Sequence, residues 1–333
     1  MTYWARSVVA NAIECTVKGV IVKVALLGTS IAQAHAAGFK AHPEVEVLIY
    51  GHTAAKAEEM GARFGYPFTT DLDSIYADPS VDLVDICLPT RMHTEHVLRA
   101  LDAGKHVLTE LPLAADLAGA REVVAAAAAS DKQVFVDMFN RFVPSSQVLV
   151  DAITGREHGR LLQLTVETNT ALLRPGFGIG LKQIPLDQML GDIDTLVRAL
   201  GVPEDIEIAT ATKNPDAAAV DAVLGYPNAL VRLSTSSMLP MSYGCRGGYR
   251  AIFDNATLEC GFSMGFDGKP DSSVTLYTAE AARRLDVPAA DQYSAMIDHV
   301  LDCLNGKAVN TLGPETVLDS LEVALRIDEA VNG

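Results

Sequence analysis

Short apolar runs alternate with longer stretches of helical composition over the first part of the chain. The apolar runs occupy residues 21–27, 45–50, 81–88, 106–109 and 133–137, and the helical patterns occupy residues 31–39, 54–64, 93–103 and 114–130. Strands that alternate with helices of this length are typical of a parallel sheet with helices on both faces. We therefore predict an α/β protein whose residues 20–142 form a doubly wound parallel sheet.

A different pattern begins at residue 143. Residues 161–168 alternate apolar and polar side chains, further segments between 206 and 277 do the same, and helical patterns occupy 186–200, 292–304 and 314–331. Half-polar strands are typical of an antiparallel or mixed sheet with one open face. We predict a second α/β domain over 143–333, with an open, mostly antiparallel sheet and a closing helix at 314–331. Residues 1–19 are predicted to be an N-terminal extension, and a signal peptide is the alternative.

Composition limits the classes of partner. A chain of 333 residues suits two domains, and its net charge of −16 would be repelled by nucleic acid and by anionic membranes. No apolar run approaches the roughly 18 residues that a membrane helix needs. The five cysteines form no C-x-x-C pair and no metal-ligand spacing. We predict a cytoplasmic protein with reduced thiols that binds a small-molecule substrate and no metal, nucleic acid or membrane.

The turn after the first predicted strand is a candidate cofactor site. Gly28, Thr29 and Ser30 follow the strand, and Ile31 begins the helical pattern. A glycine here permits a tight turn, and it lets backbone N–H groups approach a pyrophosphate at the positive end of the helix. Only the first glycine of a G-x-G-x-x-G fingerprint is present. The turn is therefore either a shortened dinucleotide site or a plain connection between a strand and a helix.

The end of the second predicted strand bears on the choice between NAD and NADP. An acidic residue is expected there to bind the ribose of NAD, but the chain reads Tyr50-Gly51-His52-Thr53. The absence of a carboxylate removes repulsion against a 2′-phosphate, which His52 and Thr53 are placed to contact. This favours NADP over NAD. The alternative is that His52 is an ordinary surface histidine.

The segment Glu110-Leu111-Pro112, within residues 104–113, resembles the Glu-Lys-Pro signature strand of the Gfo/Idh/MocA (glucose-fructose oxidoreductase and inositol dehydrogenase) family. The resemblance extends over about residues 23–333. It implies a Rossmann domain, a second domain whose open sheet forms a homodimer or homotetramer interface, and an NAD(P)-dependent oxidoreductase acting on a sugar, cyclitol or related hydroxyl or carbonyl compound. It further implies that these residues line the cofactor cleft: Leu88, Pro89, Thr90, His93, Glu110 and Asn140. For Pro89 and His93 the alternatives are a turn residue and a helix-start residue.

The resemblance also implies three catalytic groups, a lysine in the signature and an aspartate and histidine spaced as D-x-x-x-H. In this chain Leu111 stands in place of the lysine and Gly191 in place of the histidine, and only Asp187 is retained. We predict that Asp187 acts as the general acid or base, with a pKa raised by an apolar pocket. Lys182 is either a substitute cation or a solvated loop lysine. Arg141 either binds a substrate oxyanion or ties the two domains by a salt bridge.

Two other functions remain open because two of the three implied catalytic groups are replaced. The first is a catalytically silent member that senses a ligand or regulates a partner. The second is a redox-neutral lyase or isomerase that reuses the same cleft. Fold alone does not choose among them, because function depends on the site.

Overall fold

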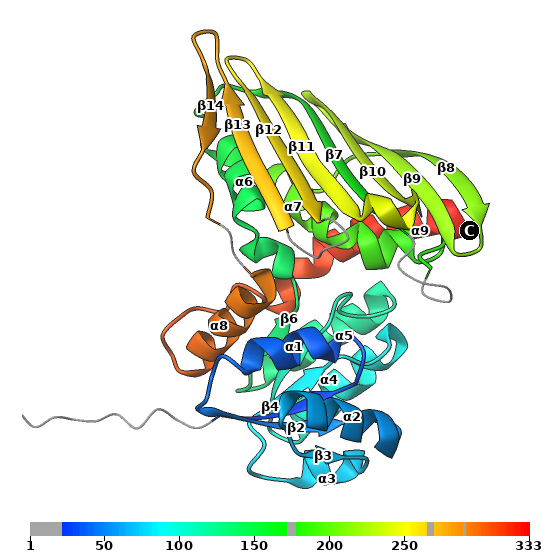
Figure 1. Cartoon of the computed structure of the whole chain (residues 1–333), viewed down its shortest axis with the longest axis vertical. Helices are drawn as coiled ribbons and strands as arrows, with labels where there is room; N and C mark the ends of the chain where they lie inside the picture. Colours follow the sequence, from blue (N-terminus) through cyan, green and yellow to red (C-terminus); the bar gives the residue numbers. More distant parts are fainter. Residues whose placement is uncertain (1–21, 172–177, 265–269, 289–290) are drawn as a thin grey trace, which may run out of the picture.

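The computed structural model describes residues 22–171, 178–264, 270–288 and 291–333. The predicted N-terminal extension at 1–19 lies outside the described residues. Two sheets form two stacked domains (Figure 1), each with its own hydrophobic core. The α/β class and the parallel sheet followed by a mostly antiparallel sheet are confirmed. Among the described helices, none is long and apolar enough to cross a bilayer.

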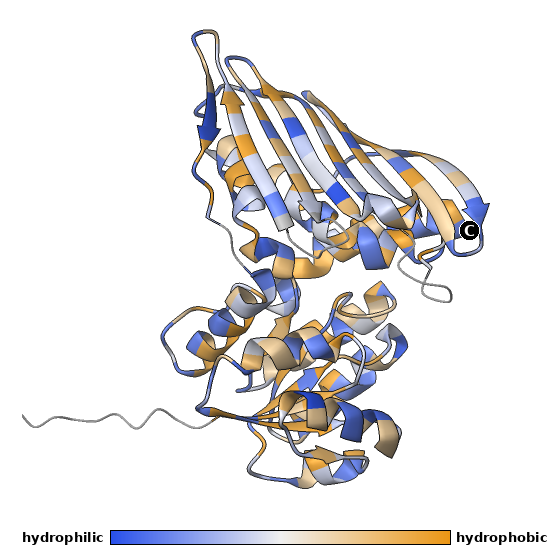
Figure 2. Ribbon diagram, viewed as in Figure 1, coloured by the Kyte–Doolittle hydropathy of each residue, from blue (hydrophilic) through white to orange (hydrophobic). Residues whose placement is uncertain are grey.

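The first sheet is parallel, with strand order β3-β2-β1-β4-β5-β6. Its central strands are buried on both faces, which explains why they are mostly apolar (Figure 2), with Lys23 and Asp85 as the polar exceptions in β1 and β4. The strands are β1 (Val22–Leu27), β2 (Val45–Tyr50), β3 (Phe68–Thr69), β4 (Leu83–Ile86), β5 (His106–Thr109) and β6 (Val134–Val136). The helices are α1 (Ala32–Phe39), α2 (Ala54–Phe64), α3 (Leu72–Ala77), α4 (His93–Asp102) and α5 (Leu117–Ala129).

Local capping explains where some of these helices begin and end. The Asp116 side chain accepts a hydrogen bond from the Gly119 amide at 2.8 Å, so α5 begins at Leu117 rather than at residue 114. Gly65, with φ of +79°, ends α2 in the left-handed conformation. The pair β3 and α3 was not predicted, because a two-residue strand leaves no period-two pattern to read.

The second sheet has the order β14-β13-β12-β11-β7-β10-β9-β8 and is antiparallel except where β10 pairs with β7. Helices cover one face and the other face is open (Figure 1). The strands are β7 (Leu161–Ala171), β8 (Ile206–Asn214), β9 (Ala217–Tyr226), β10 (Ala229–Leu239), β11 (Cys245–Phe253), β12 (Thr257–Met264), β13 (Pro270–Tyr277) and β14 (Ala282–Leu285). The covering helices are α6 (Pro144–Gly155), α7 (Leu190–Leu200) and α9 (Leu318–Asn332).

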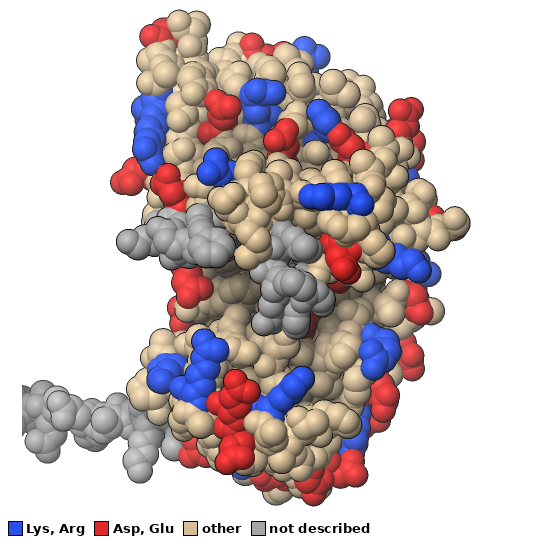
Figure 3. All heavy atoms as spheres, turned by 45° about the vertical axis from the view of Figure 1, so that its right-hand side comes forward, with Lys and Arg blue, Asp and Glu red and all other residues tan. Residues whose placement is uncertain are grey.

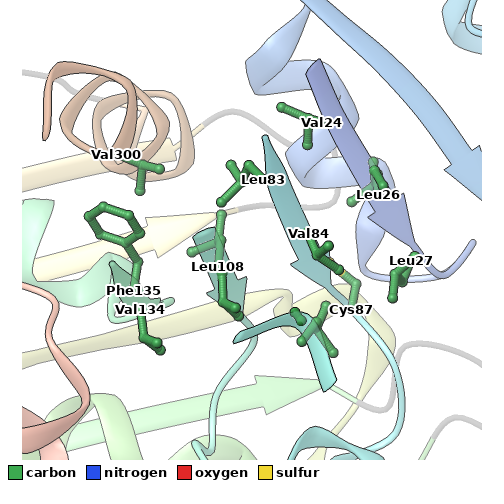
Figure 4. Packing of buried hydrophobic residues seen from close by; sticks show 14 of the residues in the cluster. Val24, Leu26, Leu27, Leu83, Val84, Cys87, Leu108, Val134, Phe135 and Val300 are labelled. Atoms are coloured by element: carbon green, nitrogen blue, oxygen red, sulfur yellow. The ribbon is translucent and has the colours of Figure 1, made fainter. Parts of the chain in front are cut away.

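Helix α8 (Gln292–Leu304) returns to the first domain after the second sheet is complete. It packs against α1, and its apolar residues Met296, Ile297 and Val300 are part of the first core. Figure 4 shows Val300 beside Phe135 of β6. The 310 turn η2 (Phe139–Phe142) and α6 lead the chain into the second domain. A division at residue 142 therefore separates the two sheets, but the first core also includes a segment from the end of the chain.

Candidate functional site

The turn between β1 and α1 presents unbonded amides at the carboxyl edge of the first sheet. Gly28 has φ of +126° and donates its amide to a carbonyl of β2 at 2.9 Å. The amides of Ser30, Ile31 and Ala32 donate to no backbone oxygen of the described residues. Unpaired amides at a helix N-terminus are suited to bind phosphate oxygens. The predicted turn residues 28–31 thus include amides without backbone partners, and anion binding there stays a prediction.

The end of β2 lies directly against this turn. A Cβ built on Gly51 would lie 3.0 Å from the methyl carbon of Thr29, so the two turns touch. His52 and Thr53 are exposed beside it. Lys56 is also exposed, in the first turn of α2, and sequence reasoning missed it. Its sequence position could have indicated it, because Lys56 follows His52 by four residues and so places a positive charge at the same end of α2.

The segment after β4 forms the next part of this edge. Thr90 begins the 310 turn η1 (Thr90–Met92), and Pro89 is exposed just before it. His93 is buried, with Nδ1 2.8 Å from the Pro112 carbonyl and Nε2 2.7 Å from the Leu88 carbonyl. Both ring nitrogens therefore contact backbone oxygens. His93 thus ties the loops after β4 and β5 together, and a direct cofactor contact from His93 stays a prediction.

The signature segment turns its glutamate away from the cleft. Glu110 is 7% exposed, and its Oε2 accepts a hydrogen bond from the Leu111 amide at 3.1 Å. Its Oε1 lies 3.3 Å from Nε2 of the buried His35. These contacts favour an internal role for the Glu110 carboxyl over the cofactor contact that the resemblance implied. Leu111, by contrast, is half-buried and packs against the cores of both domains, as does Leu186.

The space beside Gly191, where the implied histidine would lie, is filled by the side chain of Asn140. A Cβ built on Gly191 would lie 2.2 Å from Asn140 Nδ2 and 2.6 Å from Asn140 Cγ, so the Asn140 carboxamide packs directly on the glycine. Asn140 is half-buried in η2 at the junction of the domains. This contact explains a glycine in a helix, where it costs about 1 kcal/mol relative to alanine. A histidine at position 191 would require the Asn140 carboxamide to move away.

Two aspartates lie near this junction. Asp187 belongs to a π-helical turn, Ile184–Gln188, that precedes α7; it is exposed as a residue, and partial burial of its carboxyl raises its pKa. Asp192 is half-buried and accepts a hydrogen bond from Thr168 Oγ1 at 2.8 Å. Burial raises the pKa of Asp192 to about 6. The sequence pattern did not indicate Asp192 as a site residue, because its contact with Thr168 joins two distant segments.

Arg141 is fully engaged within the protein. Its guanidinium donates to both carboxylate oxygens of Asp194 at 2.8 and 2.7 Å, and its remaining N–H groups donate to Thr311 O and to the hydroxyl and carbonyl of Thr316. All five donors are used. These contacts favour the tie between domains, because every donor that a substrate oxyanion would need is already engaged within the protein.

Lys182 remains a loop residue near the site. It is exposed and lies five positions before Asp187, and no carboxylate of the described ranges is within ion-pair distance of it. On the face shown in Figure 3, the surface is hollowed between the two domains. This arrangement suits a ligand held between a nucleotide-binding turn and Asp187.

Comparisons with known proteins match most of the length of the chain. Residues 22–138 match the model of the GFO_IDH_MocA oxidoreductase family, described as an NAD-binding Rossmann fold. The uncharacterized oxidoreductase YhhX of Escherichia coli is 30% identical over 297 residues, which cover 82% of this chain and 85% of that protein. The 1,5-anhydro-D-fructose reductase of Ensifer adhaerens is 27% identical, covering 78% and 80%. Some other relatives are matched over less than half of their length, 47% in one case and 46% in another.

Solved structures share the fold at lower identity. Biliverdin reductase of Synechocystis, in complex with biliverdin and NADP⁺, superposes with a TM-score of 0.77 at 21% identity, covering 94% of this chain and 99% of that one. At this sequence identity, the similarity shows that the fold of both domains is shared, but it does not show a shared function. The two-domain arrangement is therefore common to this chain and to such oxidoreductases.

Proposed function

The chain belongs to the Gfo/Idh/MocA oxidoreductase family, and on this premise we propose that it is an NAD(P)-dependent oxidoreductase of a sugar, cyclitol or related hydroxyl or carbonyl compound. In this proposal Asp187 is the general acid or base of a site without the lysine and histidine of its relatives. The substrate class follows the family and the similarity to a 1,5-anhydro-D-fructose reductase. The observation that carries the proposal is the row of unbonded amides at the start of α1.

The residues at the carboxyl edge fit a dinucleotide. The amides of Ser30, Ile31 and Ala32 would hold the pyrophosphate, because they are unpaired and carry the positive end of α1. His52 and Lys56 would face a 2′-phosphate, and no carboxylate precedes them after β2 to repel it. Pro89 and Thr90 would flank the nicotinamide ribose. We therefore propose that NADP(H) is preferred over NAD(H).

When bound, the dinucleotide supplies the acceptor or donor of a hydride. The remaining chemistry is the removal of a proton from a substrate hydroxyl, or its return to a carbonyl oxygen. Asp187 is suited to this because burial raises its pKa toward the working range of an acid–base catalyst. Leu111 places an apolar side chain, not an ammonium group, at the domain junction. The carboxyl of Asp187 thus performs the proton transfer without a cation from that position, and Lys182 is the nearest candidate cation in sequence.

The substitution Asp187→Asn is expected to lower kcat about 10²- to 10⁴-fold, because asparagine neither accepts nor donates the transferred proton. Dinucleotide affinity is expected to stay within about twofold, since Asp187 lies in the second domain, away from the nucleotide turn. Steady-state turnover, followed by nicotinamide absorbance, measures the first quantity, and titration calorimetry measures the second.

The matched control is Asp286→Asn, which removes an exposed carboxylate of the same domain. It is expected to leave both quantities unchanged. In the wild type, alcohol oxidation should increase with pH through a raised Asp187 pKa, because the base must be ionised to accept a proton. Retention of full turnover by Asp187→Asn would refute the assignment of Asp187.

A silent, ligand-sensing member is the second candidate, and one observation favours it. Leu111 and the Asn140 carboxamide occupy the places of the implied lysine and histidine, so the site offers fewer proton-transfer groups. This candidate requires dinucleotide binding without turnover by the wild type. Restoring the lysine and histidine would discriminate the two, provided that Asn140 is shortened to alanine with Gly191→His. Activity only in that variant would support the silent candidate.

A further inference from the structure

A buried ionic cluster lies beneath the carboxyl edge of the first sheet. Its centre is His35 of α1, which is fully buried. His35 Nδ1 lies 2.9 Å from Asp85 Oδ2 on β4, and Nε2 lies 2.9 Å from Asp137 Oδ2 just after β6. Glu110 Oε1 lies 3.3 Å from the same Nε2. One imidazole therefore faces three carboxyl groups in the interior, and none of them takes part in the proposed hydride or proton transfer.

The number of protons in this cluster is constrained by its geometry. An imidazole donates from both ring nitrogens only in its protonated form. Three ionised carboxyl groups around one imidazolium would leave a net charge of −2 in the interior. Each uncompensated buried charge costs several kcal/mol, so at least one carboxyl group must keep its proton.

Two carboxyl oxygen atoms are the candidates to hold that proton. Glu110 Oε1 and Asp137 Oδ1 are buried and have no hydrogen-bond partner among the described residues. Burial raises the pKa of Glu110, and the Asp137 charge raises it further, against the opposing effect of the nearby His35. Asp85 Oδ2 and Asp137 Oδ2 each lie 2.9 Å from a ring nitrogen of His35, whereas Glu110 Oε1 lies 3.3 Å away. The neutral carboxyl group is therefore assigned to Glu110.

His35 is suited to the charged form. Burial alone would lower its pKa, but the Asp85 charge and the hydrogen bonds to Asp137 and Asp85 outweigh burial, and the pKa lies well above 6.5. The distances of 2.9 Å on both ring nitrogens are those of N–H···O hydrogen bonds. No lysine or arginine of the described chain pairs with the three carboxyl groups, so His35 is their cation.

Two further titratable groups face the cluster. Cys87 Sγ lies 3.6 Å from His35 Nδ1 and 3.6 Å from Asp85 Oδ1, and burial raises the pKa of its thiol. The Tyr293 ring, from α8, has its centroid 5.9 Å from that of His35. Burial raises the pKa of the Tyr293 hydroxyl, and the Asp137 charge raises it further. Both groups are thus neutral, and they enclose the cluster without adding charge.

The cluster joins the two sides of the nucleotide cleft. His35 lies four residues after Ile31, one turn along α1 from the unbonded amides. Glu110 accepts the amide of Leu111, the residue at the domain junction. We propose that His35, held as an imidazolium by Asp85 and Asp137 with Glu110 as a neutral acid, is a positioning residue that fixes the nucleotide turn against the Leu111 segment. The ligand of that turn rests on the proposed function, but the protonation of the cluster does not.

Nitrogen-15 NMR of the histidine-labelled wild-type protein tests the protonation directly. The expected result is a slowly exchanging imidazole with protons on both Nδ1 and Nε2 at pH 8, where exposed histidines are neutral. A single ring proton on the buried histidine at that pH would overturn the proposal. His35→Gln identifies the signal by its loss. This measurement needs no ligand, so it is independent of the proposed function.

Three isosteric variants test which carboxyl group is neutral. Glu110→Gln mimics a protonated acid, so its imidazolium signal and its melting temperature at pH 7 should match those of the wild type. Asp137→Asn and Asp85→Asn each remove a charge that holds the imidazolium, so each should lose the second ring proton or lower the melting temperature. Loss of the imidazolium in Glu110→Gln, with retention in Asp137→Asn, would contradict the assignment.

Dinucleotide titration tests the positioning role. His35→Gln is expected to weaken NADP⁺ binding at least about tenfold, equivalent to about 1.4 kcal/mol, while the control Glu46→Gln, at an exposed site of β2, changes it by less than about twofold. Wild-type affinity should fall as the pH rises above the raised pKa values of Glu110 and His35, because their folded forms lose protons there. A folded His35→Gln protein with unchanged affinity and pH profile would refute the positioning role. If His35→Gln does not fold, the wild-type pH profile decides, and a flat profile refutes it.

Discussion

Replacing Arg141 with methionine is expected to lower the free energy of unfolding by about 3–5 kcal/mol, the usual cost of removing one partner of a buried ion pair. Asp194 is fully buried and receives two hydrogen bonds from the guanidinium. Its other bond, from Ser320 Oγ at 3.0 Å, does not neutralise it. Methionine keeps much of the apolar stem but leaves this carboxylate without a cation. Urea denaturation at pH 7 measures the change.

The control for this prediction is Arg160→Met. Arg160 also donates two bonds to one carboxylate, that of Asp254, but both side chains are accessible, at 70% and 32%. Exposed pairs contribute about 0–1 kcal/mol because water solvates the separated charges. Equal losses in the two variants would show that the contribution of the Arg141 pair does not depend on its burial, and would contradict the prediction.

Replacing Gly28 with alanine is expected to destabilise the first domain by about 2–6 kcal/mol and to abolish dinucleotide binding. Its φ of +126° is a conformation that side chains rarely adopt, and an added Cβ would lie 2.4 Å from the Cys87 carbonyl oxygen. Relief of this contact must move the turn whose amides are to bind the pyrophosphate. Thermal unfolding and calorimetric titration measure the two effects.

Gly65→Ala is the matched control, since Gly65 also has a positive φ, of +79°, but no atom lies within 4 Å of the added Cβ. Only the conformational cost applies there, about 1–2 kcal/mol. It should bind dinucleotide as the wild type does. A Gly28→Ala protein as stable as Gly65→Ala, with intact binding, would be inconsistent with the role assigned to this turn.

The sequence predicted those features that depend on local patterning. Continuous apolar runs located the buried parallel strands, and alternation located the half-open sheet. The return of α8 to the first core was not predicted, because the pattern of apolar residues on one helix face is the same whichever domain the helix packs against. The parallel pairing of β10 with β7 is likewise decided by tertiary register and not by strand composition.

The site was predicted less completely because its contacts join distant segments. Arg141 had two readings from sequence, and the choice depended on Asp194 and Thr316, which lie far along the chain. Nothing local to Gly191 indicates that Asn140 packs on it. Similarly, the inward orientation of Glu110 follows from its contact with His35 on another element. Local sequence identified these residues, but tertiary contacts determined what each one touches.

The central claim is that this chain binds a nicotinamide dinucleotide at the start of α1 and uses it for hydride transfer. Titration calorimetry of the full chain with NADP⁺, NADPH, NAD⁺ and NADH tests it most directly. We expect a dissociation constant of about 1–100 µM for at least one form, with NADP(H) bound more tightly than NAD(H). Absence of heat or fluorescence change with all four compounds at millimolar concentration would contradict the claim.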